Sequence, residues 1–258
     1  VLPFLYMAAN SLKTYGETVT RTAAFPFNPA FWPKVPQWVN YQTAWSEANL
    51  SRYFFNSVVI ASVTVAGIII TSALAAFAFS KLKFAGRDTV FTILLATLMI
   101  PETVLLIPNF LMVSRLGWVD TLWALTVPFM GSAFFIFLLR QFFNQVPDTL
   151  LESARIDGAN HLGMLIRIVM PLSRAPLFTV GFLGFTGAWN ALQWPLVVTR
   201  SPQWRPISVG LITFLQEAAA MIHLRLAGSM IALAPVVLVY VVAQRQITEA
   251  VARTGLKG

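Results

Sequence analysis

The sequence predicts an all-α integral membrane protein with six membrane-spanning helices, the first of which is truncated. Three observations support this prediction: the composition, a series of long apolar runs, and basic residues that gather in the connections between those runs. Hydrophobic residues make up 57% of the 258 residues and charged residues only 11%, with a mean hydropathy of +0.70. Soluble domains contain about 25% charged residues, so this deficit indicates a lipid environment.

The N-terminal apolar stretch is shorter than the roughly 20 residues that are needed to cross a bilayer. We expect residues 1–12 to be the end of a first membrane-spanning helix that begins before this sequence. Residues 13–56 then form an extracytoplasmic loop. Its prolines indicate irregular backbone and its tryptophans are typical of the membrane interface, and residues 39–55 are expected to form one interfacial helix.

Five further apolar runs follow, and each is near the length that a membrane-spanning helix requires. They occupy residues 57–80, 90–113, 121–139, 176–198 and 226–243. The run at 90–113 is interrupted by Pro101-Glu102 and Pro108, and the run at 121–139 contains Pro128. Residues 57–258 are therefore expected to form the transmembrane core.

The connections between the runs indicate the orientation, because Lys and Arg concentrate on the cytoplasmic side of membrane proteins. Basic residues gather after the second span, in the connection that contains residues 147–171, and in the tail at 244–258. All three regions fall on the same side of the membrane. We therefore expect residues 147–171 and the C-terminus to be cytoplasmic.

The composition also bears on several classes of function. The basic residues are scattered, so the net charge of +8 does not indicate nucleic-acid binding. Without cysteine and with two histidines, the chain has no predicted metal site, and it lacks the phosphate loop of ATP-hydrolysing proteins. A secondary transporter that works alone is an alternative, although intramembrane acids are scarce and no inverted repeat is evident. An intramembrane enzyme is a further alternative, but no catalytic constellation is apparent.

The polar segment at residues 147–171 has a pattern that predicts two helices around a glycine turn. Thr149 and Glu152 match a capping box, and Asp148 is an alternative cap. Gly158 is suited to end the first helix, because glycine adopts a positive φ at little steric cost.

A second helix is expected at residues 161–170, capped by Asn160 and ended by Pro171. Small side chains on this segment allow a partner surface to approach the backbone, and charged side chains surround them. The small residues are Ser153, Ala154 and Ala159, and the charged residues are Glu152, Arg155 and Asp157.

The spacing E-S-A, three residues, G, nine residues, I-V-M-P resembles the cytoplasmic EAA loop of permease subunits of ATP-binding-cassette importers. The matching positions are Glu152, Ser153, Ala154, Gly158, Ile168 and Pro171. Ser153 and Met170 depart from the commoner Ala and Leu but are close to them in size. Flanking pairs such as Asn56-Ser57 and Trp189-Asn190 are similar to the carbohydrate-uptake branch, including its maltose-type second permease.

The resemblance implies the six-helix fold of a type I importer permease, in which residues 147–171 form the coupling loop that seats on the ATPase. The implied coupling residues are Glu152, Ser153, Ala154, Arg155, Asp157, Gly158, Ala159 and Asn160. It also implies a bacterial or archaeal inner membrane and three kinds of partner: a second homologous permease, two ATPase subunits and an extracytoplasmic solute-binding protein. ATP and Mg would be bound by the ATPase, and this chain would hold no cofactor, metal or catalytic residue.

The resemblance implies import of a sugar or oligosaccharide by alternating access, with a glycerol-phosphate-type or other small polar solute as the alternative. Asn190, Gln193 and Trp194 are spaced to share a helix face, beside Trp189. Amides can bond sugar hydroxyls and indoles can stack on sugar rings. The other interpretation is an interfacial aromatic belt with amides that satisfy a kink at Pro195.

Glu102 is the one acid well inside the apolar runs. Intramembrane acids often mark a transport pathway or gate. The alternatives are a pair with the companion permease or a place near the outer surface. The sequence alone does not decide between a role in the pathway and these alternatives.

Overall fold

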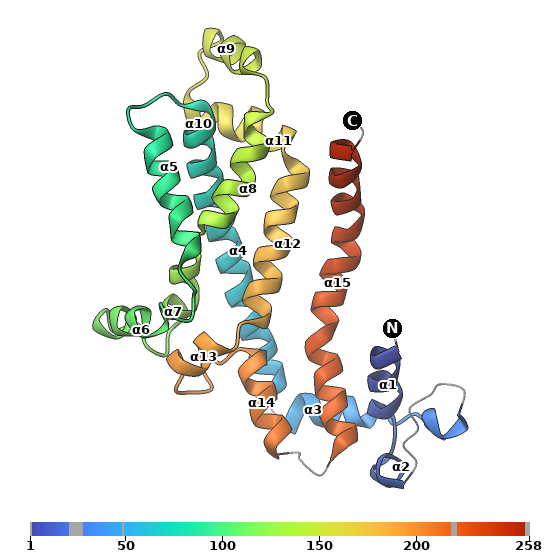
Figure 1. Cartoon of the computed structure of the whole chain (residues 1–258). Helices are drawn as coiled ribbons and strands as arrows, with labels where there is room; N and C mark the ends of the chain where they lie inside the picture. Colours follow the sequence, from blue (N-terminus) through green and yellow to red (C-terminus); the bar gives the residue numbers. More distant parts are fainter. Residues whose placement is uncertain (1, 21–27, 48, 218–220, 256–258) are drawn as a thin grey trace. The chain divides into compact units, whose positions relative to one another are not determined.

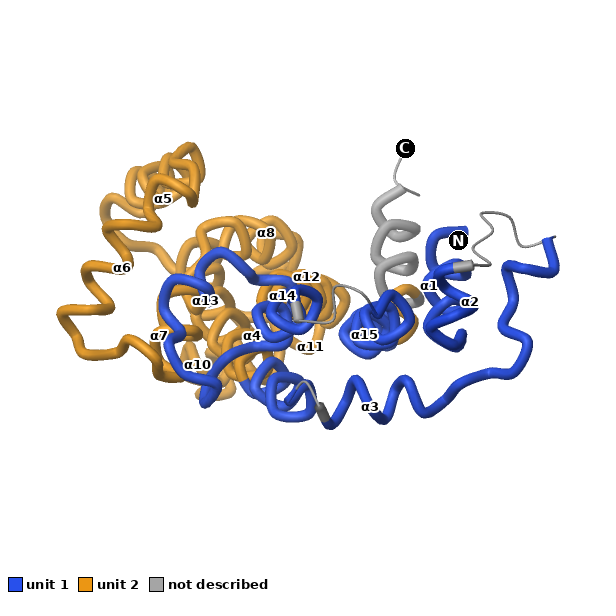
Figure 2. The backbone as a smooth tube through the Cα atoms, turned by 90° about the horizontal axis from the view of Figure 1, so that it is seen from below, with its two compact units in different colours: residues 1–59, 189–238 blue, residues 60–188, 239–258 orange. Residues whose placement is uncertain are grey.

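The computed structural model describes residues 2–20, 28–47, 49–217 and 221–255, and all of their regular secondary structure is helical (Figure 1). Val1 and the end of the predicted cytoplasmic tail, residues 256–258, lie outside the described residues. The chain divides into two compact units, coloured separately in Figure 2. Unit 1 comprises residues 1–59 and 189–238, and unit 2 comprises residues 60–188 and 239–258.

Unit 1 begins with the N-terminal segment. Its elements in this segment are α1 (Leu2–Ser11), α2 (Tyr15–Thr20), the short η1 (Pro29–Phe31) and α3 (Val39–Glu47). The Lys13 ammonium is fully buried and donates to the Ala30 carbonyl at 2.7 Å, while the Asn40 amide donates to the carbonyls of Ser11 and Lys13. These bonds hold the end of α1 against the described residues around Ala30 and Asn40.

The predicted single helix at residues 39–55 is wrong. Helix α3 ends at Glu47, and a new helix, α4 (Leu50–Lys81), begins well before the predicted start of the span at residue 57. Asn49 lies between them with φ +50. Asparagine is among the few non-glycine residues that tolerate this left-handed region, so the break occurs there.

The rest of unit 1 packs against the first turns of α4. Its helices are α13 (Gln193–Val198), α14 (Ile207–Glu217) and the first part of α15 (Ile222–Gly255). The Asn56 amide donates to the carbonyls of Gln203 and Arg205, and the Ile207 amide donates to the Ser57 hydroxyl. These bonds give partners to backbone groups in the connection between α13 and α14, which has no regular secondary structure.

Unit 2 contains the remainder of α4 and the segments that follow it. They are α5 (Arg87–Ala96), η2 (Thr97–Met99), α6 (Leu106–Arg115), α7 (Leu122–Thr126), η3 (Val127–Phe129), α8 (Ala133–Asn144), α9 (Asp148–Ile156), α10 (His161–Met164), the π-helical η4 (Leu165–Val169), α11 (Met170–Leu172) and α12 (Arg174–Asn190). The run at 90–113 divides at Pro101, and Pro108 falls in the first turn of α6, where a proline is tolerated.

Within the described residues, two helices are long and apolar enough to cross a membrane, Leu50–Lys81 and Ile222–Val242. Two bent pairs of helices pass the same test together, which would raise the number to four. One pair bends by 45° between η3 and α8. The other bends by 87° between residues 161–172 and α12, so the helical run from α10 to α11 lies nearly perpendicular to α12.

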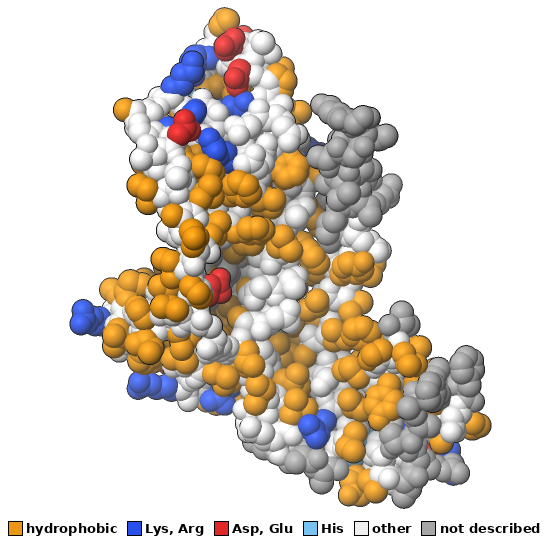
Figure 3. Space-filling view, viewed as in Figure 1, with side chains coloured by type: hydrophobic (Ala, Val, Ile, Leu, Met, Phe, Trp, Pro, Cys, Tyr) orange, Lys and Arg blue, Asp and Glu red, His pale blue; other side chains and the backbone are white. Residues whose placement is uncertain are grey.

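The buried core of unit 2 draws on α4, α8, the segment 146–169 and α12. Its fully or nearly fully buried members include Phe77, Leu139, Phe143, Val169 and Val180. In Figure 3 the charged side chains gather at the end of unit 2 that carries α5, α9 and α10, and hydrophobic side chains cover the adjoining part. This pattern is expected of helices whose middle faces lipid and whose end faces water.

Candidate functional site

Helix α9 forms the first half of the segment 147–171, which we call the coupling loop. The N-cap of α9 is Pro147, two residues before the predicted N-cap Thr149, and no side chain in the described part of the chain caps it. The predicted capping box is therefore wrong. Thr149 lies inside the helix, and its carbonyl accepts a bond from the Ser153 hydroxyl at 2.9 Å. The Asp148 carboxylate has a stronger partner elsewhere, because it pairs with Lys81.

The turn after α9 has the geometry that the sequence predicts. Gly158 adopts φ +83. The Ala159 amide donates to the Ala154 carbonyl at 2.9 Å and the Gly158 amide donates to the Arg155 carbonyl at 3.1 Å. This pair of bonds is a Schellman motif, which satisfies the last carbonyls of a helix and needs a left-handed residue at this position.

The second half of the coupling loop begins at its predicted cap. The Asn160 side chain accepts a bond from the Gly163 amide at 2.7 Å. The predicted end at Pro171 is wrong, because the helical run continues to Leu172. The π-helical turn of η4 precedes Pro171 and widens the helix, which relieves the clash that a proline ring makes with the carbonyl four residues earlier.

One face of the coupling loop is anchored in the core of unit 2. Leu151, Met164, Leu165 and Val169 are buried there, together with Phe77 of α4. Burying side chains of this size contributes roughly 1.5–3 kcal/mol each. The loop therefore has a fixed position on unit 2.

The other face is exposed and carries the predicted coupling residues. Six of the eight are exposed and two are half-buried. The exposed residues are Glu152, Ser153, Arg155, Asp157, Gly158 and Asn160, and the half-buried residues are Ala154 and Ala159. Within the described residues, the charged groups of Glu152, Arg155 and Asp157 have no ion pair or hydrogen bond. Ile156, beside them, is 87% exposed, which is unusual for a large apolar side chain.

Lys81, the last residue of α4, makes a contact with the coupling loop that sequence reasoning missed. Its ammonium donates to the Val146 carbonyl at 2.6 Å and to the Asp148 carboxylate at 2.7 Å. The bond from Lys81 holds the pKa of Asp148 below its usual range. Such a contribution is fully present above the usual pKa of the carboxyl and is lost as the pH falls through the lowered value, so the pair stays charged at neutral pH. The sequence shows only a lysine directly after an apolar run and gives no indication of its partner.

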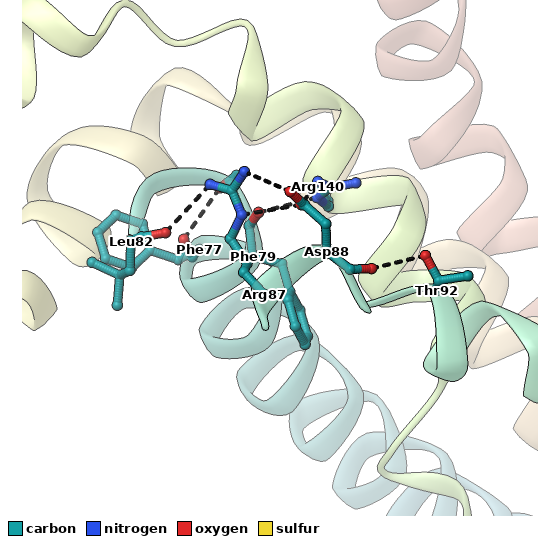
Figure 4. Close-up of polar contacts among 8 residues, drawn as sticks. Phe77, Phe79, Leu82, Arg87, Asp88, Thr92 and Arg140 are labelled. Carbon is teal, nitrogen blue, oxygen red and sulfur yellow. Dashed lines mark hydrogen bonds and ion pairs between the residues drawn. The ribbon is translucent and has the colours of Figure 1, made fainter. Parts of the chain in front are cut away.

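Arg140 of α8 joins three helices at the same end of unit 2 (Figure 4). Its guanidinium donates to the Phe79 carbonyl of α4 at 3.1 Å, lies 3.4 Å from the Asp88 carboxylate of α5, and stacks 3.9 Å above the Phe91 ring. Arg87 also bonds Asp88 and donates to the Leu82 carbonyl. Figure 4 shows the two guanidinium groups on either side of one carboxylate.

The four aromatic and amide candidates for solute contact lie in unit 1, but the predicted shared helix face is wrong. Helix α12 ends at Asn190 and α13 begins at Gln193, with Leu192 at φ −126 between them. Pro195 has no amide hydrogen for the Ala191 carbonyl, so a continuous helix would leave that carbonyl without a partner. The Ser208 hydroxyl donates to it instead, at 2.6 Å.

The tryptophans and the amides of this group differ in exposure. Trp189 is 3% exposed, packs edge-on against Phe54, and donates its indole hydrogen to the Ala232 carbonyl at 3.0 Å. Pro235 lies inside α15 and has no amide hydrogen, so the carbonyl four residues before it has no helical partner. Ala232 is the residue directly after that carbonyl. Trp194 is 8% exposed, whereas Asn190 and Gln193 are exposed.

Glu102 lies in unit 2, in the turn between η2 and α6, and is exposed. Its carbonyl accepts the Leu105 amide at 3.1 Å, as in a tight turn. Among the described residues, no three His, Asp or Glu side chains lie close enough together to hold a metal ion.

The chain and its fold have counterparts in known proteins. The family model of the binding-protein-dependent transport system inner membrane component matches residues 64–253. The chain is 30% identical over 259 residues to the arabinooligosaccharides transport system permease protein of Halalkalibacterium halodurans, which covers 100% of this chain and 91% of the relative. It is 34% identical over 208 residues to the sn-glycerol-3-phosphate transport system permease protein of Agrobacterium fabrum, which covers 80% of this chain and 74% of the relative.

A crystal structure shares the arrangement of helices. It is that of a bacterial ABC transporter involved in the import of the acidic polysaccharide alginate, and one chain matches with a TM-score of 0.84 at 24% identity. The match covers 95% of this chain and 89% of that chain. At this level of identity the similarity shows a common fold.

Proposed function

Because this chain belongs to the binding-protein-dependent transport system inner membrane components, we propose that it couples solute import to a partner ATPase through residues 147–171. The predicted fold of an importer permease is confirmed by the family match and by the TM-score of 0.84. A stand-alone secondary transporter does not fit this family, whose members work with a separate binding protein. The relatives are transport permeases, not enzymes.

The observation that carries the proposal is the division of the coupling loop into an anchored face and an exposed face. The anchored face fixes the loop on unit 2, and the exposed face presents small residues and unpaired charges. Ser153 and Ala159 leave the backbone open to a partner, and Glu152 is free to meet a basic group. Such a surface fits a cleft on an ATPase, with the exposed Ile156 as an apolar anchor.

The remaining partners follow from this role. Two ATP-binding-cassette ATPases would bind ATP and Mg, and a second homologous permease would complete the pathway across the membrane. Closure of the ATPases on ATP would bring the two coupling loops together and switch access from one side to the other. This chain would supply neither a cofactor site nor a catalytic residue. Its coupling loop and its C-terminus would face the cytoplasm.

The proposed solute is a sugar or oligosaccharide. It is supported by the similarity to an arabinooligosaccharide permease over the whole chain. Asn190 and Gln193 are the proposed contacts in unit 1, because both residues are exposed and carry amides, which can bond sugar hydroxyls. Trp189 and Trp194 would form the wall behind them, and Glu102 would line the pathway in unit 2. The similarity to a glycerol-3-phosphate permease supports a phosphate-bearing solute as the second candidate.

The coupling role is tested with a matched pair of variants, Ser153→Trp and Ser46→Trp. Both serines are exposed and helical, and each hydroxyl bonds the carbonyl four residues earlier at 2.9 Å. The indole of Ser153→Trp should hinder docking of the ATPase. A loss of about 1.4 kcal/mol in binding free energy already lowers the affinity tenfold. Ser46→Trp lies on α3 and should leave uptake unchanged.

The measurements are copurification of the ATPase with the tagged chain and uptake of radiolabelled solute in vesicles. If Ser153→Trp binds the ATPase and imports solute like the wild type, the proposal fails. The solute is tested by binding of the partner solute-binding protein to a panel of sugars and to glycerol 3-phosphate. Tight binding of glycerol 3-phosphate without any sugar would replace the first candidate with the second.

A further inference from the structure

The Lys81 ammonium is buried at the junction between α4 and the coupling loop. Its side chain is 5% exposed, whereas that of its partner Asp148 is 76% exposed. A buried ammonium is costly unless its hydrogens are bonded, and two acceptors of the loop bond it here, the Val146 carbonyl and the Asp148 carboxylate. The position of Lys81 is therefore fixed by the loop, and the position of the loop by Lys81.

The two acceptors flank Pro147, which is the N-cap of α9. Proline has no side-chain group that can cap a helix, and no other side chain of the described residues bonds the first amides of α9. The start of α9 is thus held by the end of α4. The anchoring is polar and short, at 2.6 and 2.7 Å, and differs in kind from the apolar packing of Leu151.

The end of α4 is in turn held by its neighbours. Arg140 fastens the Phe79 carbonyl to α8 and, through Asp88, to α5 (Figure 4). Three helix ends therefore form one network, and Lys81 is the point where α9 attaches to it. Such a network of ion pairs and hydrogen bonds is a physical route by which displacement of one element biases another.

We propose that Lys81 is a positioning residue that transmits displacement of α9 to α4, and so converts ATP hydrolysis into a change of access. The inference rests on the proposed coupling role of residues 147–171. Within unit 2, α4 continues without a break from residue 60 to Lys81, so a displacement at Lys81 acts on a rigid helix.

The test compares four versions of the complete transporter, reconstituted with its ATPases, second permease and binding protein in liposomes. Lys81→Met removes both bonds and keeps the length of the side chain. Lys81→Arg keeps the charge and the donors. Lys83→Met removes a charge two residues away, from an exposed side chain, and serves as the matched control.

The readout is the number of ATP molecules hydrolysed per solute imported, because a purely structural defect lowers hydrolysis and uptake together. Lys81→Met should keep hydrolysis that is stimulated by the binding protein, while uptake falls about tenfold, within the range of measured coupling effects. Lys81→Arg should restore most of the uptake, and Lys83→Met should match the wild type.

Three outcomes would overturn the inference. They are an unchanged ratio in Lys81→Met, an equal loss of hydrolysis and uptake, and a loss of assembly that Lys81→Arg does not repair. Ser153→Trp, measured beside these variants, distinguishes failure of the proposed coupling role from failure of the proposed role of Lys81. If Ser153→Trp imports normally, the coupling role itself fails. If it is inactive while Lys81→Met keeps the wild-type ratio, only the role of Lys81 fails.

Discussion

Gly158 shows at the scale of one residue how the coupling loop acquires its shape. Its φ of +83 allows the chain to reverse direction within the two bonds of the Schellman motif, and the next helix begins at the Asn160 cap. No atom outside its immediate neighbours lies within 4 Å of a Cβ placed there. The requirement for glycine is therefore one of backbone conformation, and not of space.

The first prediction concerns Gly158→Ala. A left-handed conformation costs an alanine about 1–2 kcal/mol, so the turn should open and copurification of the ATPase should decrease. Gly158→Asn should be milder, because asparagine tolerates this region better than alanine does. Hydrogen exchange of residues 153–161 reports on the turn directly.

Gly117→Ala is the control for this prediction. Gly117 has φ +69, and the Trp118 amide donates to the Val113 carbonyl in the same kind of motif, after α6. The strain should be similar, but the ATPase should still copurify. Equal retention of the ATPase by Gly158→Ala and by the wild type would contradict the prediction.

At the scale of helices, close packing of α14 against α4 depends on a second glycine. A Cβ at Gly210 would lie 2.0 Å from Cδ2 of Tyr53, whose side chain is buried and whose ring cannot turn away freely. Gly228 of α15 approaches Phe214 in a similar way, at 2.9 Å from the Cβ position. Small residues of this kind let membrane helices approach each other closely.

The second prediction is that Gly210→Ala destabilises unit 1 by about 1–3 kcal/mol, the usual cost of overpacking. Thermal unfolding of the purified complex in detergent measures it. In Gly187→Ala, the new Cβ meets nothing within 4 Å, and the unfolding temperature should not fall. Combined with Tyr53→Ala, the loss should be smaller than the sum of the two single losses, since the two sites are in contact. Additive losses would argue against the contact as the cause.

Features held by local bonds were easier to predict from the sequence than features held by distant partners. The caps at Gly158 and Asn160 were predicted correctly because their bonds are local and each residue type has one common use there. The alternative cap at Asp148 failed because its carboxylate has a partner 67 residues away, in Lys81. The break at residues 191–192 depends on Ser208, which also lies far along the chain. Tertiary partners of this kind leave no signature in a short window.

At the scale of the whole molecule, the membrane class and the family were accessible from composition and motif spacing. The apolar runs predicted most of the membrane segments, yet prolines divide several of them in the structure. The network around Arg140 could not be predicted, because it joins residues of α4, α5 and α8. The solute contacts proposed at Asn190 and Gln193 stay a prediction.

The third prediction concerns sidedness and uses the absence of native cysteine. Ile156→Cys on α9 and Trp38→Cys before α3 place thiols at positions that are 87% and 69% exposed. A membrane-impermeant maleimide should label Trp38→Cys in intact cells and Ile156→Cys only in inverted vesicles or lysed cells. Labelling of both residues from one side would contradict the proposed orientation.

The local closure of the glycine turn has a consequence for how importers diversify. Its hydrogen bonds join residues between 154 and 163, so the conformation of the α9–α10 turn is determined mainly by its own residues. A hairpin of this kind keeps its own turn wherever its first turn meets a lysine and its buried side chains meet an apolar core. If the proposed coupling role holds, the contact with the ATPase and the contact with the solute lie on separate segments of the chain and can change independently.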